Sequence, residues 1–271
     1  MATRDVAAPM QAKIVLQGAG KRFDARGREM RALEPIDLEI GSGEFVALVG
    51  PSGCGKSTIL NLIAGLLAPT EGRVLYDGTP VVGLNRSVGY MTQKDNLLPW
   101  RTVKANVRVA LELKCRSTTS GDIDARVAAM IETVGLTGFE AHFPSELSGG
   151  MRKRVALART LIYEPETLLM DEPFGALDAQ LKLLMLDQLQ RLTRDRRVTV
   201  IFVTHDLGEA ITLADRVVVF SARPGRIRAV RHSSFERPRD VFKLRFAPEF
   251  AGLYEDLWDE LKDEVGKGTD V

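Results

Sequence analysis

A glycine-rich loop that carries a lysine and a serine is the first segment of this sequence equipped for chemistry. It reads GPSGCGKS at residues 50–57, and Thr58 follows it. Its members are Gly50, Pro51, Ser52, Gly53, Cys54, Gly55, Lys56 and Ser57. Glycines let successive backbone N–H groups point into one concavity, where they bind phosphate oxygens. Lys56 would then reach the β- and γ-phosphates of a nucleotide, and the Ser57 hydroxyl would coordinate Mg²⁺.

Two adjacent carboxylates, Asp171 and Glu172, follow the short apolar run at 168–170. The carboxyl ends of strands in open α/β sheets collect ligands, so this position suits a catalytic pair. We expect Asp171 to hold Mg²⁺ and Glu172 to orient and deprotonate an attacking water. Without a phosphate loop, such a pair would more often be a solvated strand end. Together with the loop, it predicts nucleotide hydrolysis.

A third element, LSGGM at 147–151, precedes a run with helical spacing. Ser148 is expected to cap the helix, and the amides of Gly149 and Gly150 to form a second anion site. Here the chain resembles the ATP-binding cassette (ABC) family, whose signature LSGGQ appears as LSGGM. The resemblance covers about residues 14–227. It implies an α/β P-loop NTPase fold, a RecA-like core with an antiparallel β part and an inserted helical subdomain, with ATP and Mg²⁺ as cofactors.

The resemblance also implies roles for four further residues. Phe23 matches the aromatic residue that stacks on adenine, usually a tyrosine. Gln93 matches the glutamine that contacts Mg²⁺ and the attacking water. Asp178 matches the D-loop along the dimer interface and is also a plausible helix N-cap. His205 matches the switch histidine that acts with the catalytic glutamate. Outside this family context, each would more often be a core, surface or structural residue.

In this family each ATP lies between the phosphate loop of one subunit and the signature of the other. The resemblance therefore implies a second ATP-binding subunit, in a homodimer, with Ser148, Gly149 and Gly150 acting in trans. ATP would favour the closed dimer because its γ-phosphate contacts both halves, and hydrolysis would remove that bridge.

The elements that must position these residues follow from hydrophobic periodicity. Strands are expected at 13–17, 36–40, 45–49 and 73–76, and helical pattern at 102–134 with a polar break at 116–122. We predict a flexible tail at 1–12, an ATPase domain at 13–235 with the helical subdomain at about 94–163, and an extension at 236–271. Leu253, Leu257 and Leu261 predict an amphipathic helix in that extension that packs on the core.

Composition excludes several classes of protein. The 271 residues carry 37 Lys and Arg against 36 Asp and Glu, so nothing favours nucleic-acid binding, which needs concentrated positive charge. Two cysteines, Cys54 and Cys115, do not suggest a disulfide framework or a metal site. We expect a reactive, accessible thiol at Cys54, beside Lys56 at a helix N-terminus. No apolar run approaches the roughly 18 residues of a membrane span, and 1–12 has no signal-peptide core.

Two segments narrow the resemblance. LLPWRTVKANV at 97–107 and SARPGRI at 221–227 look like importer ATPases of the nitrate, sulfonate and taurine group, which includes systems for pyrimidine-like compounds. The function implied is ATP hydrolysis coupled to uptake of a small solute. The partners implied are transmembrane permease subunits and, indirectly, a solute-binding protein, with the chain peripheral on the cytoplasmic face of the membrane.

The sequence leaves two alternatives, one for an apolar cluster and one for the function. Leu97, Leu98 and Trp100 form either a contact surface for a membrane partner or local packing of the helical subdomain. The alternative function is a soluble ABC-type ATPase that remodels DNA or ribosomes, although such proteins usually carry coiled coils, a fused second cassette or basic extensions. A GTPase or small-molecule kinase would leave LSGGM unexplained.

Overall fold

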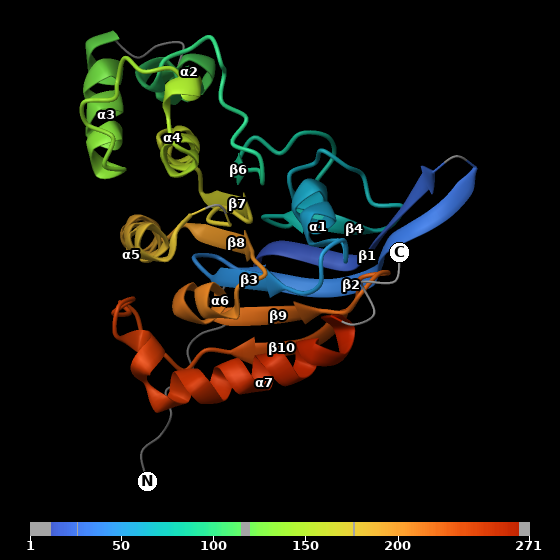
Figure 1. The fold of residues 1–271 in the computed structure, drawn as a ribbon. Helices are drawn as coiled ribbons and strands as arrows, with labels where there is room; N and C mark the ends of the chain where they lie inside the picture. The colour runs from blue at the N-terminus through green and yellow to red at the C-terminus, as the bar shows by residue number, and fades with distance from the viewer. Residues whose placement is uncertain (1–11, 26, 115–119, 176, 266–271) are drawn as a thin grey trace.

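The computed structural model describes residues 12–25, 27–114, 120–175 and 177–265. The predicted N-terminal tail, apart from residue 12, and Cys115 lie outside these residues. Within them the strands form two sheets, with the helices packed around and between them (Figure 1).

The larger sheet has the strand order β10-β9-β3-β8-β7-β6. Its strands are β3 (Phe45–Val49), β6 (Val88–Met91), β7 (Thr167–Asp171), β8 (Thr199–Val203), β9 (Arg216–Phe220) and β10 (Ile227–His232). All pair in parallel except β10, which runs antiparallel to β9. All five residues of the central strand β3 are buried, which explains its uninterrupted apolar sequence.

The smaller sheet is antiparallel, in the order β2-β1-β4-β5. Its strands are β1 (Ala12–Ala25), β2 (Arg28–Gly41), β4 (Glu71–Tyr76) and β5 (Thr79–Pro80). Helix α1 (Lys56–Ile63) contacts β4 of this sheet and both β7 and β8 of the larger one. Its buried Ile59, Leu60 and Ile63 join a core that both sheets share. The helix that begins at the phosphate loop is therefore held from two sides.

Helices α2 (Val103–Lys114), α3 (Ser120–Thr133) and α4 (Gly149–Leu161) form a separate lobe beside the sheet edge at β6 (Figure 1). A 3₁₀ turn, η1 (Pro144–Glu146), leads into α4. Their inward apolar side chains, among them Val107, Val127 and Val155, join the core on the other face of the larger sheet. The expected break in the helical pattern falls between α2 and α3, and α3 begins within it, at Ser120.

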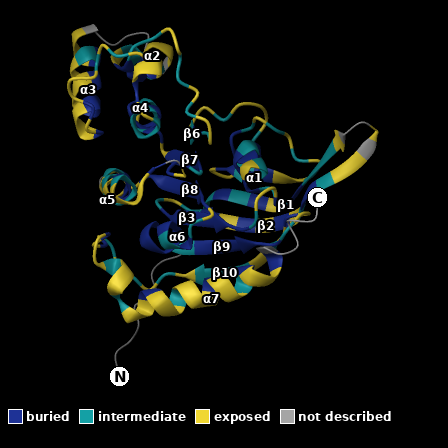
Figure 2. Cartoon of the chain, viewed as in Figure 1, coloured by how far each residue is buried: buried dark blue, intermediate teal, exposed yellow. Residues whose placement is uncertain are grey.

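Helices α5 (Ala179–Asp195) and α6 (Leu207–Leu213) cover the larger sheet, and η2 (Leu244–Phe246) leads to α7 (Pro248–Val265). The predicted amphipathic helix is confirmed, because Leu257 and Leu261 of α7 are buried while its outer face is exposed (Figure 2). The sequence did not predict strand β10. Its two arginines, Arg228 and Arg231, hid the strand pattern, and both form ion pairs with Glu260 of α7.

Candidate functional site

The phosphate loop closes around its own lysine. Gly55, just before α1, has φ 100°, and a Cβ there would lie 2.9 Å from the Ala32 carbonyl oxygen of β2, so glycine is required. Lys56 is buried, and its Nζ donates hydrogen bonds of 2.8 Å to the carbonyl oxygens of Gly50 and Pro51. An ammonium group therefore sits inside the loop, where the sequence predicts phosphate oxygens.

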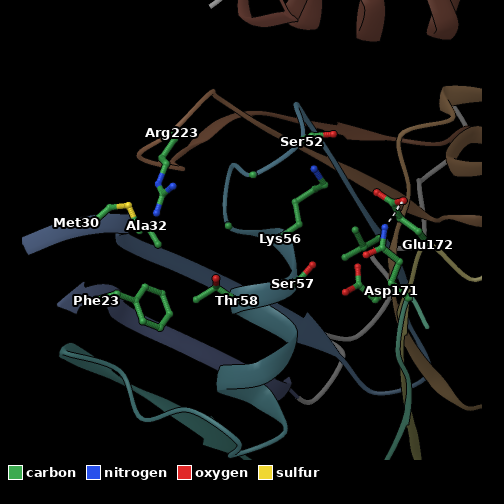
Figure 3. Close-up of a pocket in the computed structure, with 14 residues that line it drawn as sticks. Phe23, Met30, Ala32, Ser52, Lys56, Ser57, Thr58, Asp171, Glu172 and Arg223 are labelled. Carbon is green, nitrogen blue, oxygen red and sulfur yellow. Dashed lines mark hydrogen bonds between the residues drawn. The ribbon is translucent and has the colours of Figure 1, made fainter. Parts of the chain in front are cut away.

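A hollow of about 470 Å³ opens over this loop (Figure 3). The predicted residues that line it are Phe23, Ser52, Gly53, Gly55, Lys56, Ser57, Thr58, Gln93, Asp171 and Glu172. They come from the β1 strand, the loop, the start of α1 and the ends of β6 and β7. The fold thus brings the first two chemical motifs of the sequence to one cavity.

The buried Asp171 ends strand β7. Burial raises the pKa of its carboxyl group, the hydrogen bond from the Ser57 hydroxyl opposes that rise, and the charge of Glu172 adds to it. A desolvated carboxylate next to a hydroxyl oxygen suits a hard cation, which would favour the ionised form. Ser57, Asp171 and the Gln93 side chain are the residues that would hold Mg²⁺.

Glu172 stands in the left-handed backbone region with φ 45°, unusual for a residue other than glycine. Its N–H donates a 2.9 Å hydrogen bond to the Val203 carbonyl oxygen at the end of β8, which holds this conformation. Glu172 is thereby turned into the hollow beside Asp171 (Figure 3). A backbone conformation of this kind costs about 1–3 kcal/mol and is concentrated at functional sites.

Two further predicted residues meet the Glu172 carboxylate. The Gln93 side-chain amide donates a 3.3 Å hydrogen bond to Oε2, and His205 Nδ1 lies 3.6 Å from the same oxygen. Gln93 follows β6, Glu172 follows β7 and His205 follows β8, and these three strands are neighbours in the sheet. The amide therefore orients one carboxylate oxygen through a hydrogen bond, and the imidazole lies beside it, beyond hydrogen-bond distance. This arrangement suits a general base.

The opposite end of the hollow carries apolar and cationic side chains. Phe23 is half-buried there, and Lys21 Nζ lies 5.3 Å from the centroid of its ring. Met30 and Arg223 line this end too, and the sequence did not predict either of them as a site residue (Figure 3). Arg223 is held at this end of the hollow because the Gly225 carbonyl oxygen, two residues later, accepts a 2.9 Å hydrogen bond from Glu34 N–H of β2. An aromatic face with nearby cations suits a nucleobase or its sugar.

The signature residues lie elsewhere. Ser148 caps α4 as predicted, since its hydroxyl accepts a 3.2 Å hydrogen bond from Met151 N–H. Ser148 is exposed, and Gly149 and Gly150 are half-buried. Among the described residues that line the hollow, none belongs to this segment. The amides of the signature and the phosphate loop of the same chain do not share a cavity.

Asp178 caps α5 as predicted, because its carboxylate accepts hydrogen bonds from the N–H groups of Gln180 and Leu181, at 3.1 and 2.9 Å. It does not belong to the described lining of the hollow either. Its role in a dimer interface stays a prediction.

The expectation of an accessible thiol at Cys54 is wrong. Its side chain has no exposed surface and lies in the core shared by both sheets, with Sγ 3.5 Å from Lys56 Nζ. The Cys54 N–H donates a 3.4 Å hydrogen bond to the Pro51 carbonyl oxygen, and Cys54 does not belong to the described lining of the hollow. Its predicted part in phosphate binding stays a prediction.

Comparisons with known proteins agree with this geometry. The family model described as ABC transporter matches residues 33–175. An uncharacterized ABC transporter ATP-binding protein of Methanocaldococcus jannaschii is 45% identical over 258 residues, covering 95% of this chain and 94% of the relative. The aliphatic sulfonates import ATP-binding protein SsuB of Bacillus cereus is 41% identical over 226 residues, covering 83% of this chain and 88% of that protein.

The fold has solved counterparts as well. A dimeric ATP-binding cassette, MJ0796, in a post-hydrolysis state bound to ADP and Pi, is 31% identical with a TM-score of 0.75. The match covers 82% of this chain and 100% of that one. Family model, relatives and fold all lead to one assignment: the chain belongs to the ABC transporter family and is one of its ATP-hydrolysing cassettes.

Proposed function

We propose that this chain is the ATP-hydrolysing subunit of a membrane importer and that it works as a homodimer closing over two ATP molecules. The observation that carries the proposal is the separation of the signature from the hollow of its own chain, because only a second copy can complete the site. The dimeric state of the structural neighbour supports this arrangement.

Within each site the residues have distinct tasks. The backbone N–H groups of Gly53 and of 55–58 and the Lys56 ammonium orient the phosphate tail. Glu172 accepts the proton of the attacking water, while Gln93 holds its carboxylate through a hydrogen bond and His205 lies beside the same oxygen. Bound Mg²⁺, held by Ser57, Asp171 and Gln93, would supply charge neutralisation on the phosphates. The amides of Gly149 and Gly150, at the start of α4, contact the γ-phosphate held by the partner.

A complementation experiment tests the trans arrangement. Lys56→Ala removes the phosphate ligand and Gly149→Asp places a carboxylate in the signature; each is combined with Glu172→Gln, which removes the base and lets bound ATP be trapped. Either double variant alone should trap no nucleotide. Their mixture contains heterodimers with one intact loop facing one intact signature, and should trap one ATP per dimer. If the mixture traps no nucleotide, like each double variant alone, the signature acts within its own chain.

Importer function rests on the relatives and on one surface feature. None of the described helices is long and apolar enough to cross a membrane. Trp100 is 72% exposed, whereas Leu97 and Leu98 are half-buried and Leu97 packs on the core, so local packing accounts for part of the apolar cluster. We assign Trp100 to the contact with a transmembrane permease. The proposal includes a peripheral location on the cytoplasmic face of the membrane.

The solute belongs, in this proposal, to the nitrate, sulfonate, taurine or pyrimidine-like class, and the relative named for aliphatic sulfonates supports a sulfonate. A solute-binding protein would deliver it to the permease. Co-purification of the chain with a permease from membranes, and its loss in Trp100→Ala, tests the assignment. Recovery with ribosomes or DNA instead would support the alternative remodelling function, which the names of the relatives do not favour.

A further inference from the structure

Three cationic side chains of α4 hold the segment that follows β6. Arg152 Nε donates to Asp95 Oδ2 at 3.1 Å, and Arg159 donates to the carbonyl oxygens of Asp95 and Asn96 at 2.7 and 2.8 Å. Between them in the sequence, Lys153 donates through Nζ to the carbonyl oxygen of Gln93. We call Arg152, Lys153 and Arg159 the α4 clamp. It joins the helix that begins at the signature to the segment that carries Gln93.

Lys153 is the member of the clamp nearest the reacting centre. It is 8% exposed, and burial lowers the pKa of its ammonium group, an effect that the carboxylates of Asp95, Asp171 and Glu172 oppose. Burying an ammonium group is costly unless a hydrogen-bond partner satisfies it. The Gln93 carbonyl oxygen is that partner, so the position of α4 and the position of Gln93 depend on each other.

Gln93 is anchored at both ends. Its carbonyl oxygen accepts from Lys153, and its side-chain amide donates to Glu172 Oε2 at 3.3 Å. The link therefore runs from α4 through one residue to the carboxylate that we propose as the general base. Small displacements of such a group matter, because a misplacement of about 1 Å in a catalytic site can cost about a hundredfold in rate.

We propose that Lys153 is a positioning residue that sets Gln93 against Glu172. Since α4 begins at the signature, docking of the signature on the partner's nucleotide would then adjust the catalytic geometry in the site of its own chain. The coupling between sites rests on the proposed dimer. The positioning role of Lys153 does not, because every contact in it lies within one chain.

Five variants of the full-length chain test the role, one of them Gln93→Ala as a reference background, with steady-state ATP hydrolysis and equilibrium ATP binding measured for each. Lys153→Met removes the donor and keeps the shape of the side chain. We expect kcat to fall about tenfold to a hundredfold and the Kd for ATP to stay within about twofold. Lys153→Arg keeps a cationic donor and should recover part of the loss in kcat, which a purely steric role would not predict.

The matched control is Arg154→Met. Arg154 is the next residue of α4 and also clamps backbone, donating to the carbonyl oxygens of Val134 and Gly135 at 3.1 and 2.7 Å. These groups lie away from Gln93, so we expect a loss of stability with kcat within about twofold of the parent. An equal fall in kcat in Arg154→Met would mean that any damage to α4 slows the enzyme, and would overturn the proposal.

The deciding variant is the pair Lys153→Met with Gln93→Ala. If Lys153 acts through Gln93, Lys153→Met should change kcat by less than about twofold when Gln93 is already alanine. The full fall in both backgrounds, or an unchanged kcat in Lys153→Met alone, would overturn the inference. Failure of the parent chain to hydrolyse ATP in the same assay, or to complement in trans, would instead count against the proposed function.

Discussion

Two buried cations, Arg239 and Lys153, each hold a neighbouring segment to the body of the molecule, but they do so differently. The Arg239 side chain is 1% exposed and makes six hydrogen bonds, whereas Lys153 has a hydrogen bond to one carbonyl oxygen. The acceptors of Arg239 are the carbonyl oxygens of Ile211, Thr212, Ala214 and Phe235 and the hydroxyl of Ser233.

The chemistry of the two side chains explains the difference. A guanidinium is planar and presents five donors in a fixed fork, while an ammonium is a compact charge on a flexible stem. Arg239 therefore fixes the chain after β10 rigidly to the end of α6, despite a burial that lowers the pKa of its guanidinium to about 10. The flexible stem of Lys153 allows its ammonium group to keep the bond through small shifts of the Gln93 carbonyl oxygen. The comparison separates a contact that stabilises the fold from one that can adjust a site.

The first prediction concerns the rigid contact and has the largest expected effect. Arg239→Met should lower the free energy of unfolding by about 3–5 kcal/mol, because it leaves buried carbonyl oxygens without a donor. Urea unfolding measures the loss. Arg239→Lys, which keeps the charge but not the fork, should lie between the parent and Arg239→Met. A loss below about 1 kcal/mol in Arg239→Met would mean that Arg239 is not essential for attachment of the extension.

Lys153→Met should lower the free energy of unfolding by about 1–3 kcal/mol, less than Arg239→Met does. It removes one charge-assisted hydrogen bond and leaves one acceptor unpaired. The same urea experiment measures it, on protein whose kcat is already known. Equal losses for Lys153→Met and Arg239→Met would abolish the distinction between the two contacts.

Hydrogen exchange sharpens the comparison without mutation. Amides of residues 93–96 should open with a free energy about 1–2 kcal/mol lower than amides of residues 233–241, because fewer buried hydrogen bonds oppose their opening. Hydrogen-exchange mass spectrometry of the parent chain measures these opening free energies, under conditions in which the exchange rate depends on the opening equilibrium. Slower exchange in 93–96 than in 233–241 would reverse the assignment of the adjustable segment.

The smallest effect is expected at a half-buried ion pair near the surface. Arg231 of β10 pairs with Glu260 of α7, with the two side chains 37% and 25% exposed. Arg231→Ala should cost less than about 1 kcal/mol, and added salt should reduce the difference from the parent. A cost near that of Arg239→Met, insensitive to salt, would show that surface pairs contribute as much to attachment of α7 as the buried arginine.

The sequence predicted those parts of the site that depend on local order along the chain. The phosphate loop, Asp171, Glu172 and His205 each follow a strand, so their meeting at one sheet edge could be inferred. Met30 and Arg223 could not, because they reach the hollow through pairing between β1 and β2 and through the contact of Gly225 with β2. The second of these contacts joins segments far apart in the sequence, about which local patterns carry no information.

The sequence also could not predict which way some side chains point or how deeply they are buried. The position of Cys54 in the loop was clear, but not that its thiol faces the core. Lys153 stands in the basic triplet 152–154, where nothing in the sequence marks one lysine as buried. Both properties depend on how the two sheets and α4 pack, and a general preference of residue types for surface or core could not have revealed them.

The left-handed backbone of Glu172 has a consequence for engineering this chain. Glycine adopts φ 45° without the steric cost that glutamate carries, so Glu172→Gly should relax the backbone while removing the proposed base. Directed evolution selected only for thermal tolerance would then favour replacing Glu172. At this position a substitution that raises thermal stability would lower the rate of ATP hydrolysis. A library of variants selected for both properties would therefore keep the glutamate.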